Sequence, residues 1–162
     1  MPINNVIQPD KIIVSDRLNL IKYDWKNDYN RIIKWYSDEE TLMLVNGNTN
    51  KYDCEQIDRM YDYQSEHGEL YFIEYDGEII GDVTFSQQDM PIVIGEKSLR
   101  HSGIGLAVIK KLIERAKSIG YDKIFVQEIY DYNVASQKLF KKAGFTEYKK
   151  TENGMSYVLN IK

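Results

Sequence analysis

Three scarcities limit what this 162-residue chain can be. Its single cysteine, Cys54, cannot form a disulfide within the chain. No N-terminal apolar run with a basic flank precedes Pro9, so no signal peptide is expected. No segment approaches the roughly 20 consecutive apolar residues that a spanning helix needs, so no membrane partner is expected. We therefore expect a cytoplasmic protein.

Charge also lacks the excess that would indicate a polyanionic partner. The chain has 21 basic and 25 acidic residues, a net charge of −4, and no block of like charges. This balance weighs against a nucleic-acid partner and is compatible with a small cationic substrate. A hydrophobic fraction of 43% and a length of 162 residues suit one compact globular domain.

Apolar residues recur with a period of two in some segments and of three or four in others, which predicts strands and helices. Asp76-Gly77 and Asn153-Gly154 favour two-residue primed turns, because both central positions need positive φ, so each predicts a hairpin. The resulting order is a mixed α/β domain. The predicted elements are a strand over 11–23, helices over 25–36 and after Asp53, a loop over 45–50, strands over 70–75, 78–86 and 91–95, a helix over 106–116, a strand over 123–129, a helix over 133–142, and strands over 146–150 and 155–161.

A hexad with two glycines, Arg100-His101-Ser102-Gly103-Ile104-Gly105, precedes the helix over 106–116. Glycine lets the backbone turn tightly and approach a ligand closely, because it has no Cβ. The first N–H groups of a helix have no intrahelical partner and its dipole is positive there, so a phosphate can accept from these donors. The hexad is therefore a candidate anion cradle, and a tight connection without a ligand is the alternative.

Further motifs follow the hexad in order: an apolar strand, Asn133, Phe140 and Ala143-Gly144-Phe145. Together these segments resemble the GCN5-related N-acetyltransferase (GNAT) superfamily over nearly the whole chain. The resemblance implies a single-domain α/β (α+β) fold whose mixed central sheet is splayed at the cofactor strand, with flanking helices. It implies an N-acetyltransferase domain over 11–162 after an N-terminal extension over 1–10, and transfer of acetyl from acetyl-CoA to an amine.

By this resemblance, acetyl-CoA binds at the hexad and at the strand before it. The hexad amides bind the pyrophosphate, and the strand pairs with the peptide-like pantetheine arm, with Gly95 at a bulge or splay. Asn133 either binds the pantetheine or caps a helix, and Phe140 packs against the arm. The side chains of Arg100 and His101 contact the cofactor or remain solvated. The implied cofactor-binding residues are Ile92, Val93, Ile94, Arg100, His101, Ser102, Gly103, Ile104, Gly105, Asn133, Ser136 and Phe140.

Acyl transfer to an amine needs a base, and an acid can protonate the leaving thiolate. Glu96 follows the cofactor strand directly and is our first candidate for the base, with Asp89, Glu128 and water as alternatives. The family's customary acid is a tyrosine at the position that Phe140 occupies here, so that role is vacant. The alternatives for the acid are Tyr130, Tyr132 and water.

The residues before the hexad are similar to the aminoglycoside 6′-N-acetyltransferases. The similarity covers 33–40, Lys51-Tyr52 and Ile94-Gly95-Glu96, and it implies an aromatic and acidic wall for a small cationic amine. Pro91 departs from the pattern, because those enzymes have an aspartate in that strand. Solvated helix and strand ends are the alternative reading of the carboxylates. The candidate substrate-binding residues are Trp35, Asp38, Asp89 and Glu128.

Two other functions stay open on the sequence. Asp16-Arg17-Leu18 is also similar to the enzymes that acetylate ribosomal-protein N-termini, which implies a protein acceptor. Phe140 in place of a tyrosine permits a noncatalytic acyl-CoA-binding regulator. No metal is expected in any of these cases, and exposed strand edges leave a homodimer open.

Overall fold

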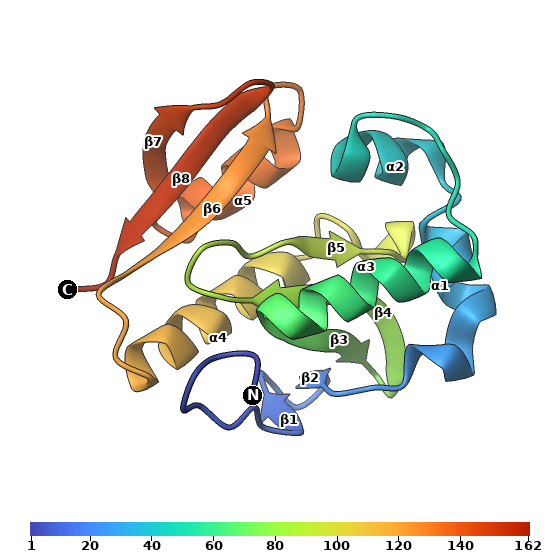
Figure 1. The fold of residues 1–162 in the computed structure, drawn as a ribbon, viewed down its shortest axis with the longest axis horizontal. Coiled ribbons are helices and arrows are strands. Elements are labelled where there is room, and N and C mark those ends of the chain that lie inside the picture. The colour runs from blue at the N-terminus through green and yellow to red at the C-terminus, as the bar shows by residue number, and fades with distance from the viewer. The chain divides into compact units, whose positions relative to one another are not determined.

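The computed structural model describes residues 1–162 and divides them into two compact units (Figure 1). The first unit comprises Met1–Thr84 and Ile92–Leu99, and the second comprises Phe85–Pro91 and Arg100–Lys162. Residues 1–10 belong to the first unit, where the Gln8 side chain donates a 2.9 Å hydrogen bond to the Leu70 carbonyl. None of the helices has both the length and the apolar composition of a membrane-spanning segment.

The first unit is built on a five-stranded sheet. Its strands, in sheet order, are β1 Lys11–Ile13, β2 Leu18–Ile21, β3 Glu69–Tyr75, β4 Glu78–Phe85 and β5 Ile92–Ile94. The pairings of β1 with β2, β2 with β3 and β4 with β5 are antiparallel. The prediction of a single strand over 11–23 is wrong, because Ser15 and Asp16 bend the chain and the amides of Val14 and Ser15 both donate to the Leu18 carbonyl.

Local capping determines where the helices of this unit begin. The elements are the 3₁₀ turns η1 Trp25–Asp28 and η2 Lys97–Leu99 and the helices α1 Tyr29–Trp35, α2 Glu39–Asn46 and α3 Cys54–His67. The Asp38 and Asp53 side chains accept 2.9 Å hydrogen bonds from the first turns of α2 and α3. The predicted helix over 25–36 therefore starts as a 3₁₀ turn, and a separate helix restarts after Asp38.

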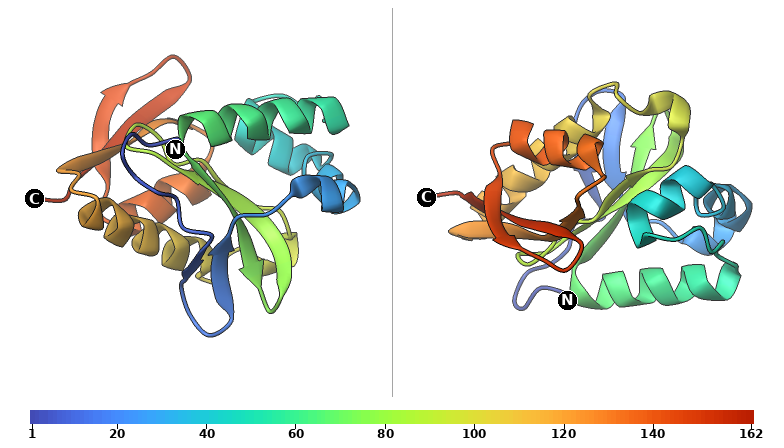
Figure 2. Two further views of the ribbon diagram at one scale, coloured as in Figure 1. Left: turned by 60° about the horizontal axis from the view of Figure 1, so that its bottom comes forward. Right: turned by 90° about the horizontal axis from the view of Figure 1, so that it is seen from above.

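Helices α1, α2 and α3 pack against one side of the sheet and form the core of the first unit (Figure 2). Tyr61 of α3 lies between Trp25 and Phe72, with ring centroids 5.2 and 5.1 Å away. Aromatic burial of this kind contributes a large share of core stability, because each ring removes much apolar surface from water. The core residues are Ile32, Trp35, Tyr36, Leu42, Ile57, Tyr61, Leu70, Phe72 and Ile79.

The predicted hairpin at Asp76-Gly77 is confirmed, since this dipeptide joins β3 to β4. Asp76 has φ 51° and Gly77 has φ 82°, the positive values that a type I′ turn needs at both central positions. The Arg17 guanidinium donates two hydrogen bonds to the Asp76 carboxylate, at 2.7 and 2.5 Å. The turn and the start of β2 are thereby tied together.

The second unit contains α4 Ile104–Ser118, β6 Lys123–Tyr130, α5 Val134–Lys142, β7 Thr146–Lys150 and β8 Gly154–Asn160. Its three strands form an antiparallel sheet in the order β6-β8-β7. The sheet expected from the sequence thus divides into a five-stranded and a three-stranded sheet. Helix α4 begins two residues before its predicted start, and the spacing of its apolar residues by three and four is confirmed by burial. The buried residues are Ile104, Val108, Ile109, Leu112, Ile113 and Ala116.

The predicted primed turn at Asn153-Gly154 is wrong, although the hairpin itself forms. Gly154 is the first residue of β8 and does not have positive φ; the Thr151 amide instead donates to the Gly154 carbonyl (3.0 Å) across the turn. A Cβ at Gly154 would lie 1.9 Å from the Ile129 carbonyl oxygen. Glycine is required here by the close approach of β6, which sequence pattern alone does not distinguish from a turn.

We expect Gly154→Ala to lower the free energy of unfolding by about 2 kcal/mol or more, because the new methyl group overlaps backbone that cannot move as a side chain can. Urea denaturation measures the loss. Glu152→Ala in the same turn is the control and should change stability by less than about 0.5 kcal/mol. Equal effects of the two substitutions would show that β6 and β8 do not approach this closely.

Candidate functional site

The hexad forms a loop of alternating backbone handedness before α4. His101 has φ 60° and Gly103 has φ 88°, whereas Arg100, Ser102 and Ile104 have negative φ. Alternation of this kind turns successive N–H groups toward one side of the chain, which makes a concavity suited to an anion. Positive φ is uncommon for a residue with a side chain, and only the glycine adopts it without steric cost.

Helix α4 begins without a side-chain cap. Its N-cap is Gly103, and no side chain accepts a hydrogen bond from its first turn. In α2, α3 and α5 the N-cap side chain does accept such a bond. The first-turn amides of Ile104 and Gly105 have no intrahelical partner, so the start of α4 fits a phosphate group.

The hexad therefore offers a ligand mainly its backbone N–H groups rather than its side chains. The Ile104 side chain is buried among the α4 core residues, so only its amide can serve a ligand. A Cβ at Gly105 would make ordinary contact with Leu139 at 3.5 Å, so packing does not require glycine there. Arg100 is half-buried, and His101, Ser102 and Gly103 are exposed.

Strand β5 places the predicted cofactor-strand residues at the edge of the first unit's sheet. Ile92, Val93 and Ile94 pair with β4 and are half-buried, and no strand of this sheet lies on the other side of β5. The outer edge of such a strand presents N–H and C=O groups with which an extended chain can pair.

A bulge or a splay is predicted at Gly95, and the hydrogen bonds there have the pattern of a bulge. The amides of Gly95 and Glu96 both donate to the Ile80 carbonyl, at 2.7 and 3.1 Å, so two residues oppose one. A Cβ at Gly95 would lie 2.2 Å from Trp35 Cγ. The glycine therefore makes room for the indole ring at the end of β5.

Trp35 and Glu96, predicted for the acceptor wall and the base, are in contact. The Trp35 indole Nε1 donates a 3.1 Å hydrogen bond to Glu96 Oε1. The indole is 2% exposed and belongs to the core, whereas Glu96 is half-buried and reaches the surface. The indole thus holds one carboxylate oxygen in place while the group keeps access to solvent.

Asp38, the second predicted wall residue, is paired within the protein. Lys97 Nζ lies 2.9 Å from Asp38 Oδ1 and 3.1 Å from the Glu40 carboxylate. Burial alone would raise the pKa of Asp38, but the hydrogen bonds from Lys97 and Thr41 outweigh it and lower that pKa to about 2. Asp38 is therefore an ionised helix cap whose charge Lys97 largely balances.

Asp89 and Glu128, in the second unit, each accept a hydrogen bond from a backbone amide. Asp89 accepts from Gln127 and Glu128 from Asn153, both at 3.0 Å. Burial raises the pKa of Asp89, and hydrogen bonds from backbone amides oppose the rise. The structure contains no group of three or more side chains placed to hold a metal ion.

The residues predicted after β6 have structural contacts of their own. Asn133 Oδ1 caps α5 by accepting from the Ser136 amide (3.1 Å), which confirms the capping role; its amide NH₂ group is not used in that bond. Phe140 is buried and meets Phe145 edge to face, with centroids 5.3 Å apart. The Tyr130 and Tyr132 rings stack at 5.4 Å.

Asp82, a buried carboxylate on β4, was not singled out from the sequence. It is 2% exposed and lies opposite Val93 of β5 in the strand register. The hydroxyls of Tyr36 and Tyr61 each donate a 2.7 Å hydrogen bond to its Oδ2. Burial raises the pKa of Asp82 to about 6, although both tyrosine hydrogen bonds act to lower it.

A signal for Asp82 is present in the sequence. It is the one charged residue within the run 79–85, in a strand where every position after Glu78 is buried. A carboxylate in such a strand must have buried partners, because an isolated buried charge is very costly. Which partners it has depends on the tertiary structure, since Tyr36 directly follows α1 and Tyr61 lies in α3.

Comparison with known proteins gives a family for most of the chain. The model of the acetyltransferase (GNAT) family matches residues 29–145. No curated protein matches the sequence. The matched region runs from α1 through the hexad to the Gly144-Phe145 end of α5.

Solved structures with the same fold share little sequence with this chain. An N-acetyltransferase from Staphylococcus aureus is 23% identical, with a TM-score of 0.65, 90% of this chain covered and 98% of the other. A putative acetyltransferase from Salmonella typhimurium, solved with acetyl-CoA, is 16% identical (TM-score 0.65; 91% and 95% covered). The ribosomal L7/L12 α-N-protein acetyltransferase RimL is 15% identical (TM-score 0.75; 93% and 97% covered). These likenesses concern the fold.

We expect Asp82 to destabilise the protein as pH rises from about 4 to 6. The unfolded carboxyl loses its proton near pH 3.8 and the folded one near 6, so the unfolded state binds fewer protons than the folded state in this window. The free energy of unfolding therefore falls by about 2–3 kcal/mol as pH rises through it. Asp82→Asn keeps an acceptor for both tyrosines and removes this effect. Urea denaturation of both proteins from pH 4 to 7 measures it.

The exposed Asp62→Asn, on α3, is the charge-matched control and should leave the slope of stability against pH unchanged. Asp38 titrates outside this window, because its stabilising contribution is lost only as pH falls from about 4 toward 2. Parallel curves for the wild type and Asp82→Asn would contradict the raised pKa.

Proposed function

Because the chain belongs to the acetyltransferase (GNAT) family, it uses acetyl-CoA, and we propose that it transfers the acetyl group to a primary amine on a small molecule. The observation that supports binding of acetyl-CoA at the hexad is the uncapped start of α4, which follows a loop of alternating backbone handedness. When bound, acetyl-CoA supplies the acetyl group as a reactive thioester.

Each predicted cofactor residue has a proposed role that its place in the fold supports. The amides of the hexad bind the pyrophosphate, because they combine converging loop donors with a helix start. The outer edge of β5 pairs with the pantetheine arm. Asn133 contributes its amide NH₂ and Ser136 its hydroxyl, while Phe140 supports the site from the core.

Glu96 is the proposed base that removes a proton from the acceptor amine. It follows the bulge at the end of β5, it is half-buried, and the Trp35 indole orients one of its oxygens. Asp82 is less suited to direct proton transfer, because Tyr36 and Tyr61 enclose it. Tyr130, Tyr132 or water is the proposed acid for the thiolate, since Phe140 has no proton to give.

Among small amines, a cationic acceptor such as an aminoglycoside is the class that the sequence favours. The net charge of −4 and the carboxylates of Asp38, Asp89 and Glu128 support it. These carboxylates already accept hydrogen bonds from the protein, so a cationic acceptor competes with Lys97 for Asp38. A protein N-terminus and a noncatalytic binding role are the alternatives.

We expect Gly103→Asn to abolish most of the rise in melting temperature that saturating CoA produces, because the new side chain enters the open space beside the loop, where the pyrophosphate is proposed to bind. Asparagine tolerates positive φ, so the fold is kept. The control is Gly77→Asn at φ 82°, where an added side chain also meets open space. Each of the two substitutions should lower the free energy of unfolding by about 1 kcal/mol. Equal CoA shifts in the two variants would contradict the cradle.

We expect free thiol release from acetyl-CoA with at least one small amine in a panel of aminoglycosides, polyamines, amino acids and N-terminal peptides. Glu96→Gln should lower kcat/KM by about 100-fold, because the glutamine still accepts from Trp35 but cannot take a proton. The exposed Glu66→Gln, on α3, is the control. Turnover of peptides alone would favour the protein acceptor, and binding without any turnover would favour the regulator.

A further inference from the structure

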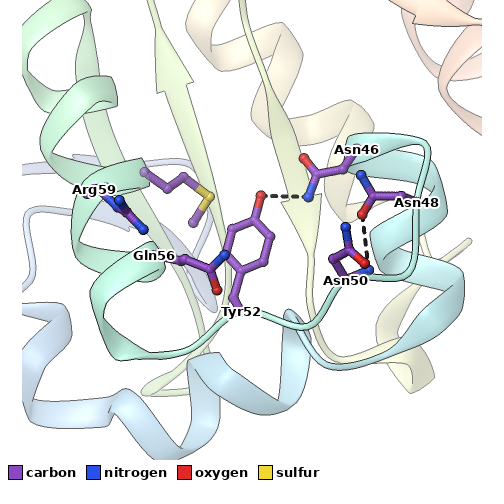
Figure 3. A pocket seen from close by; sticks show the side chains of 7 residues that line it. Asn46, Asn48, Asn50, Tyr52, Gln56 and Arg59 are labelled. Atoms are coloured by element: carbon purple, nitrogen blue, oxygen red, sulfur yellow. Dashed lines mark hydrogen bonds between the residues drawn. The ribbon is translucent and has the colours of Figure 1, made fainter.

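A polar pocket of about 270 Å³ lies in the first unit at the connection between α2 and α3 (Figure 3). Its lining contains four side-chain amides, a phenol and one guanidinium, with Met60 as its apolar member. No carboxylate lines it, although the chain as a whole is acidic. The polar lining residues are Asn46, Asn48, Asn50, Tyr52, Gln56 and Arg59.

Internal hydrogen bonds fix which atoms the amides can offer to a ligand. Asn48 Oδ1 accepts from the Asn50 backbone amide (3.0 Å), and Gln56 Oε1 accepts from the Asp53 backbone amide (3.0 Å). A backbone N–H only donates, so each of these side-chain oxygens has one of its two acceptor sites occupied, and neither bond uses the NH₂ group. The NH₂ groups of Asn48 and Gln56 are therefore donors that a ligand in the pocket can use.

The guanidinium of Arg59 adds a positive charge to these donors. Its only ion pair is with Glu55, at 3.9 Å, which is longer than a hydrogen bond, and both side chains are well exposed. A guanidinium presents parallel N–H groups that match the two oxygens of a carboxylate. Donors with one positive charge and no carboxylate suit an anionic oxygen group.

Tyr52, which lines the pocket, is held in place by Asn46 and Tyr36. The Tyr52 hydroxyl lies 2.6 Å from Asn46 Nδ2, and its ring stacks on Tyr36 with centroids 5.2 Å apart. Tyr36 directly follows Trp35, whose indole contacts Glu96. Trp35 and Tyr36 are buried, so the pocket and Glu96 are connected through the core of the first unit.

We propose that this pocket binds a carboxylate group, and that the acceptor is a small amine that also carries a carboxylate, such as an amino acid. The amine would then lie toward Glu96 while the carboxylate lies against Arg59, Asn48 and Gln56. The identity of the acceptor rests on the function proposed above, whereas carboxylate binding does not. Aminoglycosides carry no carboxylate and are disfavoured by this inference.

Matched pairs of amines that differ only by a carboxylate test the acceptor class: lysine and cadaverine, ornithine and putrescine, phenylalanine and phenethylamine, histidine and histamine. For at least one pair, we expect kcat/KM to favour the carboxylate-bearing member by about tenfold or more. Arg59→Gln should reduce that ratio about tenfold, mainly through KM. Arg17→Gln, which also removes an exposed paired arginine, should leave it unchanged.

Gln56→Glu sharpens the test. Glutamate keeps the capping-box acceptor for the Asp53 amide, so α3 still forms, but it replaces the NH₂ donor of the pocket with a negatively charged oxygen. We expect this variant to lose the preference for the carboxylate-bearing member. A preference unchanged in both Arg59→Gln and Gln56→Glu would overturn the assignment of the pocket.

Succinate, which has carboxylates but no amine, separates binding from turnover. It should raise the melting temperature of the wild type and of Arg17→Gln, and raise it much less in Arg59→Gln. These shifts without turnover of any amine would support carboxylate binding in the pocket and contradict the proposed function. Turnover of amines with no carboxylate preference, and equal succinate shifts in all three proteins, would overturn the pocket and leave the function standing.

Discussion

The packing of Trp35 on Gly95 is the contact on which the proposed acceptor side of this protein depends. Glycine is required there, because a Cβ would lie 2.2 Å from the indole. With the indole seated, its Nε1 reaches Glu96, and the next residue, Tyr36, extends toward Asp82 and stacks on Tyr52. Because Gly95 has no Cβ, the end of β5 can pack against Trp35 at the end of α1.

The charges of this unit are arranged by the same packing. Lys97 follows Glu96 and pairs with Asp38, so part of the acidic surface expected from composition is balanced within the protein. The carboxylate of Asp82 is kept in the core by two tyrosine hydroxyls rather than by a cation. The pocket at the connection between α2 and α3 is lined by four side-chain amides, a phenol, a guanidinium and Met60, and by no carboxylate, although the chain as a whole carries a net charge of −4.

Much of the fold could be predicted from local pattern, and the two Asx-Gly turns show where such a prediction fails. Asp76-Gly77 forms the predicted turn because its two residues need only their own backbone conformation. Asn153-Gly154 is a turn dipeptide of the same type, but Gly154 is required by the backbone of β6, which is distant in the sequence. Likewise, Asn133 could be identified as a cap or a ligand from its position, and only the structure shows its oxygen accepting from Ser136.

The sequence by itself determined the backbone of the proposed cofactor side, because a hexad with two glycines before an amphipathic helix specifies its own conformation and needs few distant contacts. Only the tertiary structure decided the surroundings of the residues proposed for the acceptor side. Glu96 meets Trp35 across 61 positions, and Asp82 meets Tyr36 across 46, so neither environment can be predicted from neighbouring residues. Backbone conformation is mostly a local property, whereas the burial and pairing of a charged side chain depend on which distant segments pack around it.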